Sequence, residues 1–344
     1  MSADTTGEDG APLRVLLSHR TPRPTTNPYI TTLFERLRQQ AGLEARPFSF
    51  RRAIFGRYDV FHAHWPEVMM SSERTSRRLA RVALTAAFVG RMTLSRTPVV
   101  RTAHNLELPT GLTRAQRLLL KRIDRMTVLR VTLNQQTGSL VGGQVAVVLH
   151  GDYRDRYATL DRPPAVRGRF GYVGLVRRYK GVEQLVEAFR GLPDDDLSLS
   201  VAGKPSTDEL AGEIDALASG DARITTRWEF LSDADLARAV SESELVVLPY
   251  RHMHNSGAAL TALSLSRPVL VPDNAVNRDL AAEVGPGWVI TFEGDLDGDD
   301  LRRALEETRR PDRTDAPDLS RRDWALAAPA HLGAYRHAVE IRRG

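Results

Sequence analysis

Short apolar runs alternate with amphipathic segments along almost the whole chain. In the first half, the segments LRVLLSHR at 13–20, YDVFHAH at 58–64, PVVRTA at 98–103 and FSF at 48–50 each begin or consist of such a run, and we predict a strand in each. Between them, residues 30–40 and 73–94 carry apolar side chains at helical spacing. Strands that alternate with helices in this way are typical of a parallel, doubly wound α/β sheet.

The same alternation begins again after the proline- and arginine-rich stretch LDRPPAVRGR at 160–169, which we predict to be a linker. Six further strands are expected, at 170–176, 197–202, 224–230, 245–248, 268–271 and 288–292. A helix with Asp233 as its N-cap lies among them. The pattern therefore predicts two Rossmann-like domains, at 12–160 and 168–312, followed by a last helix at 320–342 that crosses back to the first domain.

Composition narrows the class of protein. Among its 344 residues the chain has no cysteine, which excludes disulfides and thiolate metal sites and fits a reducing compartment. No window is apolar enough for a membrane span. The first twelve residues, MSADTTGEDGAP, are polar and acidic, unlike a signal peptide. We expect a cytoplasmic protein, with the inner face of the cell membrane as a possible place of attachment.

Charge is distributed unevenly over the chain. Residues 1–150 hold 22 Lys and Arg against 10 Asp and Glu, whereas the remainder holds 26 against 33. A basic first half suggests an anionic partner, and nucleic acid, anionic lipid and a phosphorylated acceptor all remain open. The helix at 73–94 carries Arg74, Arg77, Arg78 and Arg81 on its polar side. It either lies on anionic lipid or is a core helix with a solvated arginine face.

Polar residues gather directly after several strands of the first half. They are His19, His64-Trp65-Pro66-Glu67, His104-Asn105 and His150-Gly151-Asp152-Tyr153. In open α/β sheets, ligands bind at these carboxyl ends of the strands. We expect the residues to line a ligand site.

Three loops of the second half also follow strands, and they hold two of the three lysines of the chain, Lys180 and Lys204. Near Asn255-Ser256-Gly257 a helix begins, and a helix N-terminus attracts anions. The loops therefore predict a diphosphate site. The alternatives are that Ser256 only caps a core helix and that the lysines are surface residues. The candidate residues are Arg177, Lys180, Gly181, Lys204, Arg251, Asn255, Ser256, Gly257 and Thr261.

Several familiar motifs are absent. Neither G-x-G-x-x-G nor a P-loop occurs, and there is no G-x-S-x-G elbow. His62 and His64 share one face of a strand, but no third metal ligand accompanies them. We expect neither a metal nor another cofactor.

The order of the motifs resembles GT-B glycosyltransferases over nearly the whole chain. The second half of the chain is similar to the donor-binding half of the large retaining family. The segments that carry this similarity are Gly171-Tyr172-Val173-Gly174, Tyr179-Lys180-Gly181-Val182, Val201-Ala202-Gly203-Lys204-Pro205 and the stretch from 247–249 through 267–269. In the first half, 59–64, 101–105 and 150–151 match in type and order. The resemblance implies a nucleotide-sugar donor in the second domain and the acceptor in the first.

One departure from that family concerns its pair of glutamates, which would fall at Met253 and Thr261. The variant loop HNSGAALTALS is more similar to bacterial exopolysaccharide and glycolipid transferases, some of which invert. Inversion needs a carboxylate base, for which Glu67 is the first candidate and Asp152 the second, while His104 would orient a sugar. The acceptor-binding candidates are His19, His64, Trp65, Asn105, His150 and Tyr153.

The predicted function is transfer of a sugar from a GDP- or UDP-sugar to a saccharide or lipid-linked saccharide, without a metal and without nucleic acid as a partner. An epimerase of the same fold is an alternative enzyme. A basic ligand-binding or nucleic-acid-binding protein is the alternative without catalysis.

Overall fold

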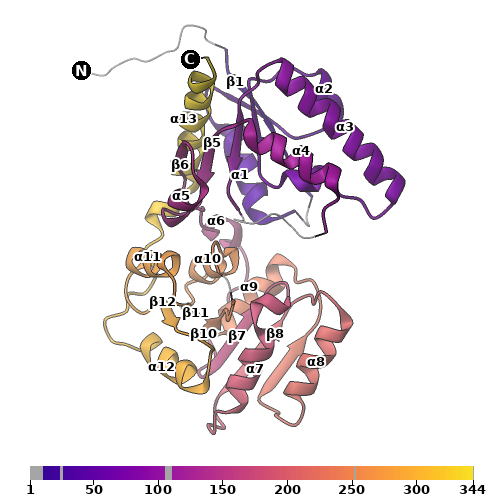
Figure 1. The fold of residues 1–344 in the computed structure, drawn as a ribbon. Coiled ribbons are helices and arrows are strands. Elements are labelled where there is room, and N and C mark those ends of the chain that lie inside the picture. Colours follow the sequence, from indigo (N-terminus) through magenta and orange to yellow (C-terminus); the bar gives the residue numbers. More distant parts are fainter. Residues whose placement is uncertain (1–10, 24–25, 105–110, 252, 344) are drawn as a thin grey trace, which may run out of the picture. The chain divides into compact units, whose positions relative to one another are not determined.

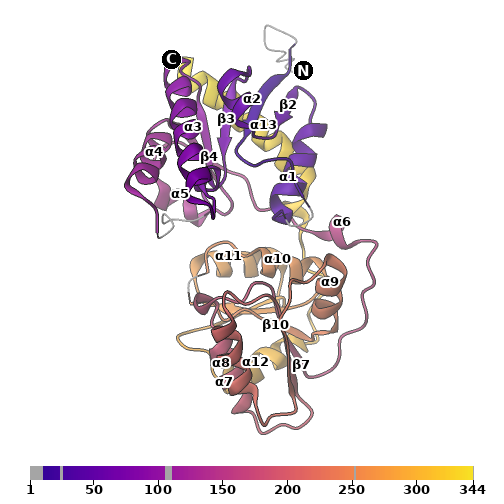
Figure 2. The same cartoon turned by 90° about the vertical axis from the view of Figure 1, so that its right-hand side faces the viewer.

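The computed structural model describes residues 11–23, 26–104, 111–251 and 253–343. The chain divides into two compact units. Unit 1 comprises Met1–Gly151 with Arg322–Gly344, and unit 2 comprises Asp152–Arg321. Both are drawn in Figures 1 and 2.

Unit 1 is built on a six-stranded sheet with the order β2-β1-β3-β4-β5-β6, in which all neighbouring strands are parallel. Its strands are β1 (Leu13–Leu17), β2 (Leu43–Arg46), β3 (Val60–Ala63), β4 (Val99–Thr102), β5 (Thr127–Thr132) and β6 (Val145–Val147). Successive side chains of a strand point to opposite faces, so Val15 and Leu17 enter one core and Leu16 the other.

Helices cover both faces of this sheet. The core of Val15 and Leu17 is closed by α1 (Pro28–Gln39) and by α13 (Trp324–Arg343), the last helix of the chain. The core of Leu16 is closed by α2 (Phe50–Phe55), α3 (Thr75–Leu94) and α4 (Arg114–Arg125). Figures 1 and 2 show α1 and α13 together on one side and α3 and α4 on the other. A 3-10 helix, η1 (Pro66–Met70), and α5 (Gln136–Val141) complete the unit.

Unit 2 contains a second parallel six-stranded sheet, with the order β12-β11-β10-β7-β8-β9. Its strands are β7 (Arg169–Val173), β8 (Ser198–Ala202), β9 (Ile224–Arg227), β10 (Leu245–Val247), β11 (Val269–Pro272) and β12 (Val289–Phe292). The helices are α6 (Arg154–Tyr157), η2 (Arg178–Lys180), α7 (Val182–Arg190), α8 (Asp208–Ala218), α9 (Asp233–Glu242), α10 (Gly257–Ser264), α11 (Ala275–Val284), α12 (Gly298–Thr308) and η3 (Ser320–Arg322). Figure 2 shows α9, α10 and α11 on one face and α7, α8 and α12 on the other.

The strand order places one ligand-binding edge in each unit. In unit 2 the chain moves outward from β7 to β9 and then returns to β10, which pairs with β7 on its other side. In unit 1 the corresponding reversal lies between β1 and β3. The loops that follow the two central strands leave the sheet in different directions there, which opens a crevice at the carboxyl ends.

The predicted α/β class with two doubly wound sheets is confirmed. Two local predictions are wrong. Residues 48–50 form no strand, because Ser49 accepts a hydrogen bond from the Arg52 N–H and starts α2. The cap of α9 is Ser232, not Asp233, since the Ser232 hydroxyl accepts from the Asp235 N–H.

The long basic helix α3 buries fewer apolar side chains than its pattern predicts. Phe88 and Val89 lie in the core, whereas Leu79 is 65% exposed and Leu84 40% exposed. Both leucines therefore share the solvent side with the arginines. Among the described helices, α3 included, none has the length and apolar character that crossing a bilayer requires.

Candidate functional site

The loops after β7, β8 and β10 are joined by backbone contacts at the switch point of unit 2. Val176 donates its N–H to the Lys204 carbonyl at 2.9 Å, and Ser206 donates to the Val176 carbonyl at 3.1 Å. A Cβ at position 203 would overlap the carbonyl of Gly174, so only glycine permits this approach. These contacts hold the loops after β7 and β8 together at the edge of the sheet.

Gly181 connects the first of these loops to the third. It has φ +66°, which favours glycine, and a Cβ there would overlap the carbonyl oxygen of Pro249. The Arg251 N–H donates to the Tyr179 carbonyl at 2.9 Å and strengthens the same junction. The segment that carries Lys180 is therefore held beside the segment that leads into α10.

Lys180 presents a partly desolvated cation at this junction. Its Nζ lies 4.8 Å from the centroid of the Tyr250 ring. Burial, followed by the nearby Arg177 guanidinium, lowers its pKa from 10.5 to about 8. In the part of the chain that the structure describes, no carboxylate lies within 4.0 Å of this ammonium and it has no hydrogen-bond acceptor. A buried cation without an acid is a feature of anion-binding sites.

The N-terminus of α10 lies next to this cation. The Ser256 hydroxyl accepts a hydrogen bond from the Ala259 N–H at 3.2 Å, so Ser256 is the N-cap of α10. This agrees with the alternative prediction that Ser256 caps a core helix. It also lies beside the hydroxyl of Tyr250, the residue over which Lys180 sits. The free N–H groups of the first turn and the helix dipole add positive potential. Capping and anion binding are therefore compatible.

The remaining predicted donor residues lie at different places. Arg177 donates through Nη1 to the carbonyls of Val176 and Lys204, and the Lys204 side chain is exposed. Asn255 is half-buried beside the cap of α10, and Gly257 opens that helix. Thr261 is buried one turn into α10, where its hydroxyl faces Tyr157. The structure thus brings Lys180, Ser256 and Arg177 to one edge and turns Thr261 inward.

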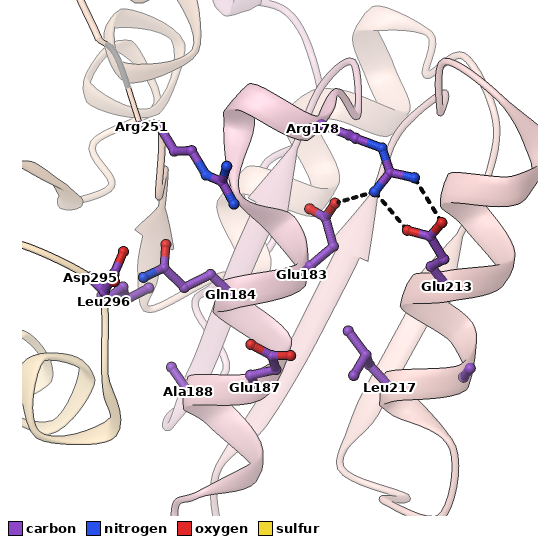
Figure 3. A pocket seen from close by; sticks show the side chains of 11 residues that line it. Arg178, Glu183, Gln184, Glu187, Ala188, Glu213, Leu217, Arg251, Asp295 and Leu296 are labelled. Atoms are coloured by element: carbon purple, nitrogen blue, oxygen red, sulfur yellow. Dashed lines mark hydrogen bonds and ion pairs between the residues drawn. The ribbon is translucent and has the colours of Figure 1, made fainter.

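A separate pocket of about 850 Å³ lies over α7 and α8 (Figure 3). Arg251 points into it near Gln184, and Arg178 forms ion pairs with Glu213 at 2.7 Å and Glu183 at 3.6 Å. Its charged lining residues are Arg178, Arg251, Glu183, Glu187, Glu213 and Asp295. Because carboxylates outnumber arginines, this pocket does not suit a diphosphate, whereas the edge at Lys180 does.

In unit 1 the strand-end histidines gather around one buried tyrosine, Tyr29. Ring centroids lie 4.6 Å from Tyr29 for His150, 5.4 Å for His104 and 6.0 Å for His64. His64 Nδ1 is 3.0 Å from His104 Nε2, and Trp65 stacks on His104 with centroids 3.8 Å apart. These side chains come from the ends of β3, β4 and β6, which the parallel sheet places at one edge.

Burial keeps the imidazoles of this cluster neutral. It lowers the pKa of His104 to about 3 and that of His150 to about 4, and it also lowers the pKa of His19 and His64. A neutral imidazole donates through one nitrogen and accepts through the other, as binding of sugar hydroxyls requires. The Nε2 atom of His64 is buried and has no partner within the described ranges.

Glu67 lies two residues after Trp65, in η1. Burial raises the pKa of its carboxyl above 4.5, while its own backbone N–H and the more distant Arg101 act in the other direction. No ion pair engages the carboxylate within the described residues. A carboxylate whose pKa is raised by burial is a better proton acceptor than an ordinary one.

Asp152 and Tyr153 belong to unit 2. The Asp152 carboxylate is bonded to the Arg154 guanidinium at 2.7 Å, and the Tyr153 N–H donates to the Ser264 hydroxyl at 2.8 Å. Tyr153 therefore joins the start of α6 to α10, and Asp152 binds the first residue of α6. Asn105, the remaining candidate, lies outside the described residues. No cluster of three metal-ligating side chains occurs in the described part of the chain.

Two residues of these sites carry no motif of their own and were missed. Tyr29 follows the Asn27-Pro28 start of α1, and Tyr250 follows Pro249 after β10. The position of Tyr250 just beyond a central strand and that of Tyr29 at the start of a helix were usable signals, but aromatic residues at such places are more often core residues.

Comparison with known proteins places this architecture in a family. Residues 167–307 match the family of glycosyl transferases group 1. A GDP-mannose:glycolipid 4-beta-D-mannosyltransferase of Xanthomonas campestris pv. campestris is 41% identical over 327 residues, which cover 95% of this chain and 93% of that protein. The chain belongs to the group 1 glycosyltransferases.

Other matches to this glycosyltransferase are more distant. An alpha-D-kanosaminyltransferase of Streptomyces kanamyceticus is 29% identical over 192 residues, covering 54% of this chain and 45% of that protein. The catalytic domain of Starch Synthase IV from Arabidopsis thaliana, bound to ADP and acarbose, has a TM-score of 0.64 at 10% identity, with 96% and 100% coverage. Anabaena HepE in complex with UDP and glucose has a TM-score of 0.57 at 14% identity, with 96% and 97% coverage. The two structures show the shared GT-B fold.

Proposed function

We propose that this glycosyltransferase transfers mannose from GDP-mannose to a glycolipid and inverts the anomeric carbon. The observation that carries the proposal is the likeness to the Xanthomonas enzyme along almost the full length of both chains. That enzyme's name specifies a GDP-mannose donor, a glycolipid acceptor and a β product. A β product from an α-linked nucleotide sugar requires inversion. The alternatives raised by the sequence, an epimerase or a nucleic-acid-binding protein, are not favoured by these matches.

Lys180, Arg177 and the N-terminus of α10 would bind the diphosphate of the donor. Support comes from the ammonium of Lys180, which lies at the switch point beside Ser256 and has no carboxylate partner among the described residues. As the bond to the sugar breaks, negative charge grows on the leaving GDP, and two cations with a helix dipole stabilise it. This arrangement supplies the positive charge that a metal supplies in other transferases, so the proposal includes no metal.

Glu67 would act as the general base. In an inverting transfer the acceptor hydroxyl loses its proton to the base while its oxygen attacks the anomeric carbon and GDP departs. The raised pKa of Glu67 and its freedom from ion pairs suit this step. His104, with a pKa of about 3, is a weak base and is assigned to hydrogen bonding with a sugar. Asp152 is occupied by Arg154.

Helix α3 would attach the enzyme to the membrane that contains its glycolipid. Its exposed Leu79 and Leu84 share the solvent side with Arg74 and Arg77, a combination that suits the surface of an anionic bilayer. This supports a peripheral location at the inner face of the cell membrane.

The proposal is tested by incubating the protein with GDP-mannose, GDP, UDP-glucose and UDP-N-acetylglucosamine and measuring the midpoint of thermal unfolding. We expect GDP and GDP-mannose to raise the midpoint and the UDP compounds to have little effect. Transfer to a lipid extract should then release GDP and give a product whose anomeric carbon–hydrogen coupling is that of a β-mannoside. Stabilisation by UDP-sugars alone, or an α product, would contradict the proposal.

A further inference from the structure

The geometry points to a second anion site, in unit 1, that binds the phosphate joining lipid to saccharide in the acceptor. The inference rests on the proposed glycolipid acceptor and specifies which part of it this surface recognises. The site is a pocket of about 380 Å³ between the loop after β1, the start of α1, η1 and α3.

The pocket has a cationic side and an apolar side. Its cationic lining residues are Arg20, Arg23 and Arg81, and its apolar ones are Ile30, Phe48, Trp65, Val68 and Met69. No Asp or Glu is among the lining residues. The pocket therefore suits a ligand that is anionic at one end and apolar at the other.

The three guanidinium groups have no carboxylate partner among the described residues. Arg81 donates to the backbone carbonyl of Ser71. Some other arginines of unit 1 do have such a partner, as Arg14 has in Asp59 at 2.7 Å and Arg101 in Asp124 at 2.9 Å. Three positive charges around one cavity repel each other, and a phosphate relieves that repulsion while offering several acceptor oxygens.

Local structure places Arg23 and the N-terminus of α1 at the pocket. The Arg23 N–H donates to the Thr26 hydroxyl at 2.8 Å and the Arg23 carbonyl accepts from the Thr26 N–H at 2.8 Å, and these two bonds hold the Arg23 backbone. Asn27, also in the lining, caps α1 by accepting from the Tyr29 N–H at 2.9 Å. The positive end of the α1 dipole thus faces the same space as the guanidinium groups.

The apolar side continues to the surface. Val68 lines the pocket and is 63% exposed. Inorganic phosphate would leave this apolar wall in contact with water, whereas the first carbon atoms of a lipid chain attached to the phosphate would cover it and remove apolar surface from water.

The pocket also adjoins the histidine cluster. His19 and Trp65 belong to both, since His19 lies 6.3 Å from His64 between ring centroids and Trp65 stacks on His104. One acceptor molecule can therefore place sugar hydroxyls on the imidazoles and its lipid phosphate among the arginines. The donor cations Lys180 and Arg177 lie in unit 2, so the two anion sites are separate.

The test uses farnesyl diphosphate as the probe and titrates it into the full-length protein by calorimetry, with GDP saturating so that the donor site is blocked. We expect Arg20→Gln/Arg23→Gln to weaken binding at least about tenfold, because each arginine offers charge-assisted hydrogen bonds. Arg125→Gln on α4, an exposed arginine outside the pocket, is the matched control and should leave the affinity unchanged. Inorganic pyrophosphate and farnesol should each bind more weakly than the probe.

Kinetics gives a second measurement. The double variant should raise KM for the glycolipid and leave kcat with a phosphate-free soluble acceptor unchanged. Equal affinity of the variant and wild-type proteins for the probe would overturn the inference. Equal binding of pyrophosphate and farnesyl diphosphate would overturn its lipid part. In both cases GDP-mannose binding and transfer would persist, whereas their loss in the wild-type protein would instead overturn the proposed function.

Discussion

Nδ1 of His62 and the hydroxyl of Tyr335 form a 2.7 Å hydrogen bond, although 273 positions separate the two residues in the sequence. His62 Nε2 bonds to the Thr102 hydroxyl at 2.8 Å, so both ring nitrogens are satisfied within the core of unit 1. Tyr335 is fully buried in α13. The last helix of the chain is thus bound through a polar contact to a central strand of the first unit.

Removing this hydroxyl should destabilise unit 1. Tyr335→Phe leaves His62 Nδ1 buried without a partner, which costs about 1–3 kcal/mol of unfolding free energy. Urea denaturation followed by circular dichroism measures this change in the free energy of unfolding. Tyr179→Phe, at a residue that is 53% exposed, is the control and should change stability by less than about 0.5 kcal/mol. Equal stability of both variants would show that the bond contributes nothing.

Stability should fall as the pH falls from about 6.5 to about 4. Burial lowers the folded-state pKa of His331 to about 4, as it does for His150, and that of His104 to about 3. In this pH range the unfolded chain binds more protons than the folded one. The free energy of unfolding therefore falls by roughly 1.4 kcal/mol for each pH unit and each such histidine.

The slope of the unfolding free energy against pH tests whether buried histidines cause this loss of stability. His331→Phe should reduce the slope between pH 6 and 5 by about one proton. The exposed His337→Gln serves as the comparison and should keep the wild-type slope. A stability that does not change between pH 7 and 5 would exclude neutral buried histidines.

Donor binding should weaken as the pH rises through about 8, because Lys180 loses its positive charge there. Lys180→Ala should lower GDP affinity at every pH, by about 1.5–3 kcal/mol near neutrality. Lys180→Arg should retain affinity above pH 9, since a guanidinium stays protonated. Calorimetric titration with GDP measures these values. Lys121→Ala, at an exposed lysine of α4, should bind GDP like the wild type, and normal affinity in Lys180→Ala would remove that residue from the site.

Glu67→Gln should abolish most turnover while GDP-mannose affinity is retained. The amide cannot accept the proton, and loss of a general base typically costs 10²–10⁴-fold in rate. In the wild type, turnover should decline as the pH falls through a pKa above 4.5, since only the ionised carboxylate accepts a proton. Glu35→Gln, on the exposed side of α1, is the control. Undiminished turnover in Glu67→Gln would require another base.

Gly203→Ala should disturb the donor edge, because the added Cβ would overlap the backbone carbonyl of Gly174 and neither backbone segment can move cheaply. We expect lower stability and weaker GDP binding. Gly212→Ala is the matched substitution, since a Cβ there meets open space within α8. It should raise stability by about 0.5–1 kcal/mol through helix propensity. Similar behaviour of the two variants in thermal unfolding and GDP titration would refute the packing argument.

Much of the fold follows from local periodicity. The helix predicted at 30–40 corresponds to α1 at Pro28–Gln39, because an apolar stripe at helical spacing specifies both the helix and its buried face. The short elements were harder. FSF at 48–50 satisfies a strand pattern, but the Ser49 cap starts a helix, and the strand of that region is the edge strand β2 at 43–46. A strand exists only through its pairing partner, which no local pattern contains.

The amino-acid sequence alone was sufficient to predict the α/β class, the repetition of a doubly wound sheet and the strand-end positions where polar residues gather. It could do so because these properties depend on periodicity within short windows. The three-dimensional structure was needed to show that Lys180 lies over Tyr250, that His64 contacts His104 and that Tyr335 bonds to His62. It was also needed to show that one pocket is lined by Arg20, Arg23 and Arg81. Each of these contacts depends on the strand order and on the close approach of segments that are far apart in the chain. The same contacts determine how far each side chain is desolvated and which charges surround it, and the proposed chemistry relies on both.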